Sequence, residues 1–239
     1  MLTRILQNKM VKKAALTAIA FVLLPASVAI ASSSATPPPS RDWTFSGPLG
    51  TYDRAAMQRG LKVYREVCSA CHSLKRIYFR NLTELGYTED QVKNIAAEYT
   101  VIDGPDDEGE MFERPAKPSD HFPSPYANEQ AAKAANGVAP PDLSLITKAR
   151  AGGADYVSAI LTGYTQPTQE FLHHNGPLAD SQHFNKYMPG NVIAMAAPLS
   201  DGQVAYEDGT PETISQYAED VAHFLTWAAE PEMEVRKRT

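Results

Sequence analysis

The sequence predicts a mainly α-helical domain with long loops, preceded by an N-terminal signal peptide. Apolar residues recur at helical spacing in several segments, and stretches rich in proline and glycine interrupt them. The chain has 239 residues, of which 43% are hydrophobic and 21% charged, as in ordinary globular proteins. This length suits one domain with long loops or two small domains.

The first 31 residues predict a secretory signal peptide. Four cations (Arg4, Lys9, Lys12 and Lys13) precede an apolar run, Ala14–Ala31, that ends in Ala-Ile-Ala. An uncleaved anchor is the alternative, since about 18 apolar residues could just span a bilayer. Pro25 and the Ser/Pro-rich sequence after the run favour cleavage. We therefore expect residues 32–239 to form an exported domain at the periplasmic face of a bacterial inner membrane.

The charge balance bears on the class of partner. The formal net charge is −6, and removing the four cations of the leader changes it to −6 − 4 = −10. The phosphates of a nucleic acid would repel so acidic a domain, which argues against nucleic-acid binding. A basic protein partner, attracted by charge, is favoured.

Both cysteines of the chain, Cys68 and Cys71, lie in VCSACHSLKR, and His72 follows directly. A disulfide three residues apart would constrain little, a redox pair would leave the histidine without a role, and a zinc site would need two further ligands. C-x-x-C-H is the attachment signature of haem c. Two thiols add to the haem vinyl groups, and the adjacent imidazole reaches the iron. The motif therefore predicts one covalently attached haem c.

The segments around this motif predict a set of helices and loops. Residues 32–50 predict a strap over the surface that contains Trp43. Helices are expected over 53–67 with Asp53 as the N-cap, from Thr88 with a capping box to Gln91, from Asn128 to a stop at Gly137, from Asp142 to before Gly152, over 155–164, and from a Thr210 cap to Pro231. Residues 101–126 predict a long acidic loop, and 165–199 an irregular stretch.

The second axial ligand of the iron decides which chemistry is possible. A methionine closes the site and suits electron transfer, whereas an open position allows peroxide or gas chemistry. The ligand must come from a segment that folds across the other haem face, which leaves KYMPG with Met188 and IAMAAPLS with Met195. Met195 is favoured by its small apolar neighbours and by Pro198, but the residues alone leave both methionines open.

Several long motifs together resemble the cytochrome c1 family, the haem c subunit of the cytochrome bc1 complex in alphaproteobacteria and mitochondria. They are GLKVYREVCSACHSLKRI, GEMFERPAKPSDHFPSPY, ANGVAPPDLSLITKAR, GNVIAMAAPLS and DGTPETISQYAEDVAHFLTWAAEP. The resemblance runs from about Trp43 to the C-terminus. It implies a cytochrome c-type haem domain, with His72 and Met195 as iron ligands.

The resemblance also implies roles for further residues. Pro140 and Pro141 match a motif that packs on the histidine side of the haem, Arg150 matches an arginine that pairs with a haem propionate, and Tyr156 matches a pocket tyrosine. Without the resemblance, a solvated cation at a helix end is the preferred interpretation of Arg150. For Tyr156, core packing is as good an interpretation as a pocket role. Met188 falls where relatives often carry an aromatic residue near the haem, which suggests a position in the pocket wall.

The function implied is electron transfer without bond chemistry in this subunit. The chain would accept one electron from a Rieske iron–sulfur protein and pass it to a soluble cytochrome c, in a membrane complex with cytochrome b. Quinol oxidation would occur elsewhere in that complex. The rival functions are a haem peroxidase or gas-binding c-type cytochrome, and a free periplasmic electron shuttle.

The chain departs from the family in two respects. Some bacterial relatives support the methionine loop with an extra disulfide, which this chain cannot form because both thiols are used. We therefore expect packing and Pro198 alone to hold the loop. The family also has a C-terminal membrane anchor, whereas this sequence stops at EVRKRT, which suggests truncation.

Overall fold

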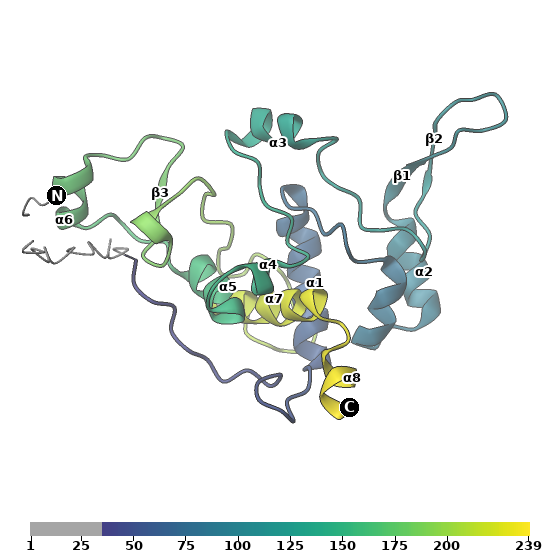
Figure 1. Cartoon of the computed structure of the whole chain (residues 1–239), viewed down its shortest axis with the longest axis horizontal. Coiled ribbons are helices and arrows are strands. Elements are labelled where there is room, and N and C mark those ends of the chain that lie inside the picture. The colour runs from purple at the N-terminus through teal and green to yellow at the C-terminus, as the bar shows by residue number, and fades with distance from the viewer. Residues whose placement is uncertain (1–34) are drawn as a thin grey trace, which may run out of the picture. The chain divides into compact units, whose positions relative to one another are not determined.

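The computed structural model describes residues 35–239, so the predicted signal peptide lies outside the described residues. This part of the chain is mainly α-helical, as predicted, with long connecting segments and two small antiparallel sheets (Figure 1). The α-helices are α1 (Arg54–Glu66), α2 (Glu89–Ala97), α3 (Glu129–Asn136), α4 (Ile146–Ala149), α5 (Gly153–Thr162), α6 (Gln169–Asn175), α7 (Ile214–Ala229) and α8 (Met233–Arg238). The short elements are 3₁₀ helices η1 (Cys68–Ala70), η2 (Phe79–Leu85) and η3 (Pro189–Asn191), and strands β1 (Thr100–Asp103), β2 (Phe112–Pro115), β3 (His183–Phe184) and β4 (Val192–Ile193).

The core is built where α1 crosses α7 (Figure 1). The predicted apolar face of α1 is buried, and Met57 is 1% exposed within it, which places its thioether in helix packing. Gly60 lies at the crossing, because a Cβ there would stand 2.1 Å from the carbonyl oxygen of Asp220. The crossing therefore requires a residue without a side chain, even though alanine has the higher helix propensity.

A buried ion pair joins the same two helices. The carboxylate of Asp220 is fully buried and accepts two hydrogen bonds from the Arg59 guanidinium, at 3.0 and 2.9 Å. The hydroxyl of Tyr206 donates a third, at 2.9 Å. A buried carboxylate needs such partners, because an unpaired charge in the core is strongly destabilising.

Helix boundaries agree with the sequence in four places. Asp53 and Thr88 accept hydrogen bonds as N-caps of α1 and α2, with the predicted capping box at Thr88. Asn128 caps α3, which stops at Gly137, and α5 covers most of the helix expected over 155–164.

The structure corrects other boundaries. Asp142 does not begin a helix, and α4 is limited to Ile146–Ala149. Helix α7 begins after Thr213, whose side chain caps it, and not after Thr210. Neither α6 nor α8 was expected, since proline and glycine obscure the periodicity around these short helices.

The acidic segment 101–126 is more ordered than the predicted loop. Strands β1 and β2 pair as an antiparallel hairpin, with Asp103 opposite Phe112. Arg114 holds its base through ion pairs with Asp103 and Asp120. The hairpin extends away from the helices (Figure 1), and its two strands have no further strand beside them within residues 35–239.

The predicted strap is present from the first described residues to Tyr52. The Trp43 indole is 8% exposed and donates to Asp155 of α5 at 2.7 Å. The same ring packs edge-on against His223 of α7, with 5.2 Å between ring centroids. The strap thus joins α5 to α7. Within residues 35–239, no helix is both long and apolar enough to cross a bilayer.

Candidate haem-binding site

Cys68, Cys71 and His72 share one tight turn that follows α1. The helix ends at Glu66, and η1 begins at Cys68. The carbonyl of Cys68 accepts hydrogen bonds from the backbone N–H groups of Cys71 and His72, at 3.1 and 2.9 Å. Both cysteines are half-buried free thiols. Burial raises the pKa of Cys68 to about 12, which keeps its thiol protonated.

A backbone carbonyl orients the His72 ring. Nδ1 of His72 lies 2.8 Å from the carbonyl oxygen of Pro141. Since a carbonyl only accepts, Nδ1 carries the hydrogen, and Nε2 keeps the lone pair that a metal needs. Burial also lowers the pKa of His72, which favours the neutral imidazole. The Tyr64 hydroxyl donates to the His72 carbonyl at 3.1 Å and fixes the backbone.

Asp142 attaches the loop that carries Pro141 to the chain after His72. Its carboxylate accepts from the Ser73 hydroxyl at 2.7 Å and from the Lys75 N–H at 3.0 Å. Burial alone would raise the pKa of Asp142, but these hydrogen bonds and those from Ser144 outweigh it, and the pKa lies below its usual value. The charged carboxylate therefore helps to hold the Pro141 carbonyl against His72.

Met195 lies in the loop after β4, and its side chain is half-buried. The Tyr164 hydroxyl donates to the Met195 carbonyl at 3.0 Å. The expectation that packing and Pro198 alone hold this loop is therefore wrong. Hydrogen bonds from the chain just after α5 also anchor it, and Asn185 and Asn191 are buried within the same region.

The other candidates lie in the segments that follow. Arg150 ends α4 with an exposed guanidinium, which makes no ion pair within residues 35–239 and so has its charge available to an anion. Tyr156 of α5 donates to the sulfur of Met188 at 3.6 Å, which brings two predicted pocket residues together. Pro140 is half-buried and adjoins Pro141.

The geometry joins the candidates in two groups. Cys68, Cys71, His72 and Pro141 are linked by hydrogen bonds through the turn and the Pro141 loop. Met195 and Met188 belong to a second segment that is tied to α5. The hydrogen bonds of residues 35–239 do not join Met195 to the His72 group.

The donor set fits haem c. The free thiols of Cys68 and Cys71 lie in a turn that ends in His72, a neutral histidine whose Nε2 is available to a metal. The unpaired guanidinium of Arg150 and the half-buried thioether of Met195 complete the set of candidate cofactor-binding groups. When bound, haem c would occupy both thiols and Nε2. The described residues contain no cluster of three or more His, Cys, Asp or Glu that could hold a bare metal ion.

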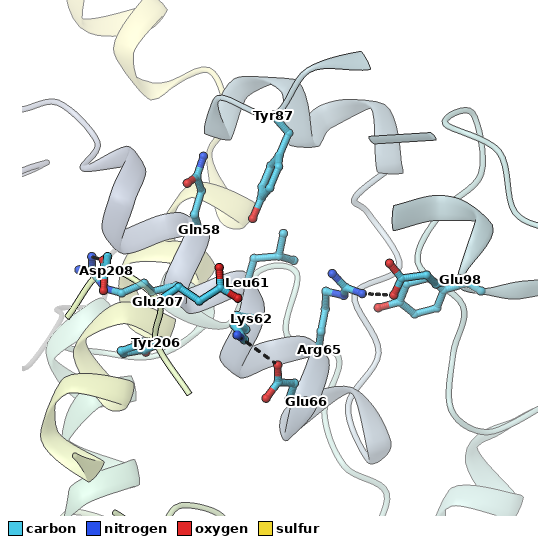
Figure 2. A pocket seen from close by; sticks show the side chains of 12 residues that line it. Gln58, Leu61, Lys62, Arg65, Glu66, Tyr87, Glu98, Tyr206, Glu207 and Asp208 are labelled. Atoms are coloured by element: carbon cyan, nitrogen blue, oxygen red, sulfur yellow. Dashed lines mark hydrogen bonds and ion pairs between the residues drawn. The ribbon is translucent and has the colours of Figure 1, made fainter. Parts of the chain in front are cut away.

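A groove of about 540 Å³ runs along one face of α1, outside this site (Figure 2). Tyr87 and the α1 side chains Lys62 and Arg65 line it, and none of the eight candidates does. Its cations are already paired, since Arg65 contacts Glu98 and Lys62 lies 3.9 Å from Glu66. The groove is therefore separate from the candidate site in its lining residues.

Sequence reasoning missed several residues that shape the site, namely Tyr64, Asp142, Tyr164 and Asn185. In the sequence, Asp142 is an acid after two prolines, and this position predicts a helix cap because Asp is a frequent N-cap. The other three look like ordinary helix or loop residues in the sequence. Their partners lie between 8 and 31 positions away, so only folding reveals them.

Three relatives show what this chain is similar to. It is 50% identical over 230 residues to "Cytochrome b/c1" of Bradyrhizobium diazoefficiens, which covers 87% of this chain and 33% of the relative. It is 54% identical over 200 residues to "Cytochrome c1-2, heme protein, mitochondrial" of Solanum tuberosum, with 83% and 75% covered. It is 45% identical over 237 residues to "Cytochrome c1" of Rhodospirillum rubrum, with 94% and 87% covered.

The chain thus spans a third of the Bradyrhizobium relative and most of the other two. The model of the Cytochrome C1 family matches residues 43–239, from Trp43 in the strap to the end of α8 and beyond. That range contains all eight candidate residues. The extent of this match and the identity to bacterial and mitochondrial relatives show that the chain belongs to the cytochrome c1 family.

Proposed function

We propose that this chain is the haem c subunit of a quinol–cytochrome c reductase of the bc1 type. It would accept one electron from a Rieske iron–sulfur protein and pass it to a soluble cytochrome c, next to cytochrome b. The proposal places the domain at the periplasmic face of a bacterial inner membrane, delivered there by the signal peptide. The chain itself would make and break no substrate bond.

The contact between His72 Nδ1 and the Pro141 carbonyl is the observation that carries this proposal. It fixes the tautomer and the direction of the imidazole, as backbone carbonyls do for metal-ligating histidines. Haem c would supply one-electron chemistry at this position.

The chain's own residues have separable tasks. Cys68 and Cys71 would retain the cofactor covalently, and His72 would ligate it from the Pro141 side. Met195 would supply a soft thioether, which favours the reduced metal and closes the site to other ligands. Arg150 would hold a carboxylate through its guanidinium, in the two-pronged geometry that arginine favours.

The rival functions need an open or histidine-ligated site. Among the other histidines, His223 packs against Trp43, His121 stacks on Tyr78, and His173 and His174 are exposed on α6. His183 of β3 pairs with Ile193, two residues before Met195, and is therefore the histidine that the spectrum has to test as a rival ligand. An optical spectrum of the haem-loaded protein separates the cases. Methionine ligation gives a weak long-wavelength band in the ferric state, whereas a peroxidase or gas-binding site gives high-spin features.

The Met195→Leu variant tests the ligand assignment. The substitution nearly conserves volume, so the fold should survive. The reduction potential should fall sharply and the ferric spectrum should turn high-spin, or low-spin with a substitute ligand, because the thioether is lost. Electron transfer from the Rieske partner should then stall. Redox titration with optical detection measures both the reduction potential and the ferric spectrum.

Met188→Leu is the matched control. It removes the other thioether of the same segment, whose sulfur contacts Tyr156 and which we place in the pocket wall. Only a modest change in potential is expected. If Met188→Leu causes the large drop and Met195→Leu does not, the ligand assignment is wrong. If neither variant changes the spectrum, the ligand is no methionine and the enzyme function becomes the better proposal.

A further inference from the structure

Two buried asparagines hold the segment that leads into Met195. Asn185 is fully buried, and Asn191 is 6% exposed. The Asn185 N–H donates to the Asn191 carbonyl at 2.9 Å, and the Asn191 side-chain amide donates back to the Asn185 carbonyl at 3.3 Å. These bonds close the six intervening peptide units into a compact turn. Buried amides without partners are costly, so this arrangement resists opening.

The same turn is attached to the end of α5. The side-chain amide of Asn185 donates to the Ile160 carbonyl at 2.7 Å, and the Lys186 N–H donates to the Gly163 carbonyl at 3.1 Å. The approach is close, because a Cβ at Gly163 would stand 2.5 Å from both the Asn185 side-chain oxygen and the Tyr187 ring. Only glycine allows this docking without displacement of the turn.

The attachment continues to Met195 itself. After Asn191, β4 pairs with β3, and Met195 follows two residues after β4 ends. Tyr164 is next to Gly163, and its hydroxyl binds the Met195 carbonyl at 3.0 Å. The end of α5 therefore holds the segment from Asn185 to Met195 at both of its ends. The only two cysteines of the chain are Cys68 and Cys71, in the predicted attachment motif, so no disulfide can hold this segment.

The backbone conformation of Asn191 is a second indication that the surrounding structure constrains this turn. Asn191 has a φ of +61°, and it is the only non-glycine residue with positive φ in the part of the chain that the structure describes. Asparagine tolerates this conformation better than most residues. Such a conformation persists only where the surroundings enforce it, and it often marks a functional segment.

We infer that Asn185 is a positioning residue for the distal ligand: its buried amide locks the 185–195 segment onto α5 and so keeps the Met195 thioether at the metal. This inference rests on the proposed ligation by Met195. Asn185 would act through Met195 and not by touching the cofactor. It sets how often the segment opens, and therefore how often another ligand can replace the thioether.

The test is imidazole binding to the haem-loaded ferric protein, followed optically. Imidazole can take the ligand position of Met195 only when the thioether of Met195 is displaced. In Asn185→Ala, the Ile160 carbonyl and the Tyr187 N–H lose a buried partner, so opening becomes easier. The apparent affinity for imidazole should rise about tenfold or more. Amide hydrogen exchange of residues 186–195 should also become faster. This measurement reports on opening of the segment and does not depend on a signal from the cofactor.

Asn81→Ala is the matched control. Its side chain also accepts a backbone hydrogen bond in a turn, from Tyr78 at 3.0 Å, but it lies in η2. It should lower stability without changing imidazole affinity. Equal imidazole affinities in Asn185→Ala, Asn81→Ala and the unmodified protein would overturn the inference.

Tyr164→Phe covers the case in which Asn185→Ala does not fold. It removes only the hydroxyl that binds the Met195 carbonyl, and it should raise imidazole affinity in the same direction. An unchanged affinity in a folded Tyr164→Phe protein would then overturn the inference. Failure of the underlying function looks different: the unmodified protein itself would lack the methionine band and bind imidazole as an open site does.

Discussion

Cys68 and Cys71 present their thiols from one turn, three positions apart and beside His72. Each thiol would add across a vinyl group, with formation of a C–S bond and transfer of the S–H hydrogen to the neighbouring carbon. Thioethers survive conditions that break metal coordination. Treatment with acid acetone should therefore leave the haem on the protein, as measured by absorbance of the precipitate.

The double variant Cys68→Ala/Cys71→Ala supplies the contrast. It keeps His72 and Met195, so a haem can still be coordinated, but acid acetone should extract it completely. Complete extraction from the unmodified protein would contradict covalent attachment and with it the central chemical assignment. Retention in the double variant would show that the attachment lies elsewhere.

At the scale of elements, the β1–β2 hairpin divides the acidic residues of its segment into two classes. Asp103 is paired with Arg114, and the Asp106 carboxylate accepts the N–H groups of Glu108 and Glu110 at 3.1 and 2.8 Å. These two acids are committed to the hairpin. The other acids of the segment, Asp107, Glu108, Glu110 and Glu113, are exposed and form no ion pair with any side chain of residues 35–239.

We expect these four unpaired carboxylates to attract a basic cytochrome c by charge. Exposed charges act over about 8–10 Å at physiological salt, so they influence the encounter more than the bound state. The triple variant Asp107→Asn/Glu108→Gln/Glu110→Gln should slow electron transfer to a basic cytochrome c at low salt. It should also flatten the dependence of the rate on ionic strength, measured by stopped-flow.

The control neutralises three exposed carboxylates elsewhere, with the variant Glu170→Gln/Asp180→Asn/Glu232→Gln. It changes the net charge by the same amount, so a general effect of charge would appear in both variants. The hairpin is the steering element only if its variant alone alters the salt dependence. An unaltered slope would make the acidic hairpin a structural feature.

At the scale of the whole molecule, the strap links the start of the described chain to its last helices. His223 of α7 is 4% exposed and packs against Trp43 and Phe45, and its Nδ1 has no hydrogen-bond partner among residues 35–239. Burial lowers its pKa below 6.5, although the nearby carboxylates Asp53, Glu219 and Asp220 oppose this and Arg59 adds to it. The folded protein therefore holds this imidazole neutral.

A pH dependence of stability follows from this burial. Between the folded and unfolded pKa values of His223, the unfolded chain binds more protons, so the free energy of unfolding falls as the pH drops below 6.5. His223→Phe keeps an aromatic ring but does not titrate, and it should lose less stability in this window. Denaturant titrations of both haem-loaded proteins at several pH values measure the difference. Parallel pH profiles would contradict a buried neutral histidine.

Carboxylates titrate at lower pH than His223, so they do not affect this comparison. Hydrogen bonds from Thr210, together with the Arg59 guanidinium, lower the pKa of Asp208 to about 2. Its contribution to stability is present above its usual pKa of 3.8 and is lost only as the pH falls through about 2. The two titrations therefore separate along the pH axis.

The sequence by itself determined the helical class, several helix starts and the C-x-x-C-H motif, because these depend on residues within a few positions of each other. The caps at Asp53, Thr88 and Asn128 are such local signals. The motif resemblance likewise identified the family, which the match over 43–239 shows. Spacing along the chain is enough for features of this kind.

Only the tertiary structure decided how the site is held. The Asp142 carboxylate looked like a helix cap but binds Ser73, 69 positions away, and the Asn185 amide binds Ile160, 25 positions away. Within the acidic segment, β1 and β2 pair as a hairpin, and Arg114 forms an ion pair with Asp103 across it. Each of these side chains has a local partner available in principle. Folding decides between the alternatives, since a buried polar group takes whichever partner the packed backbone brings to it.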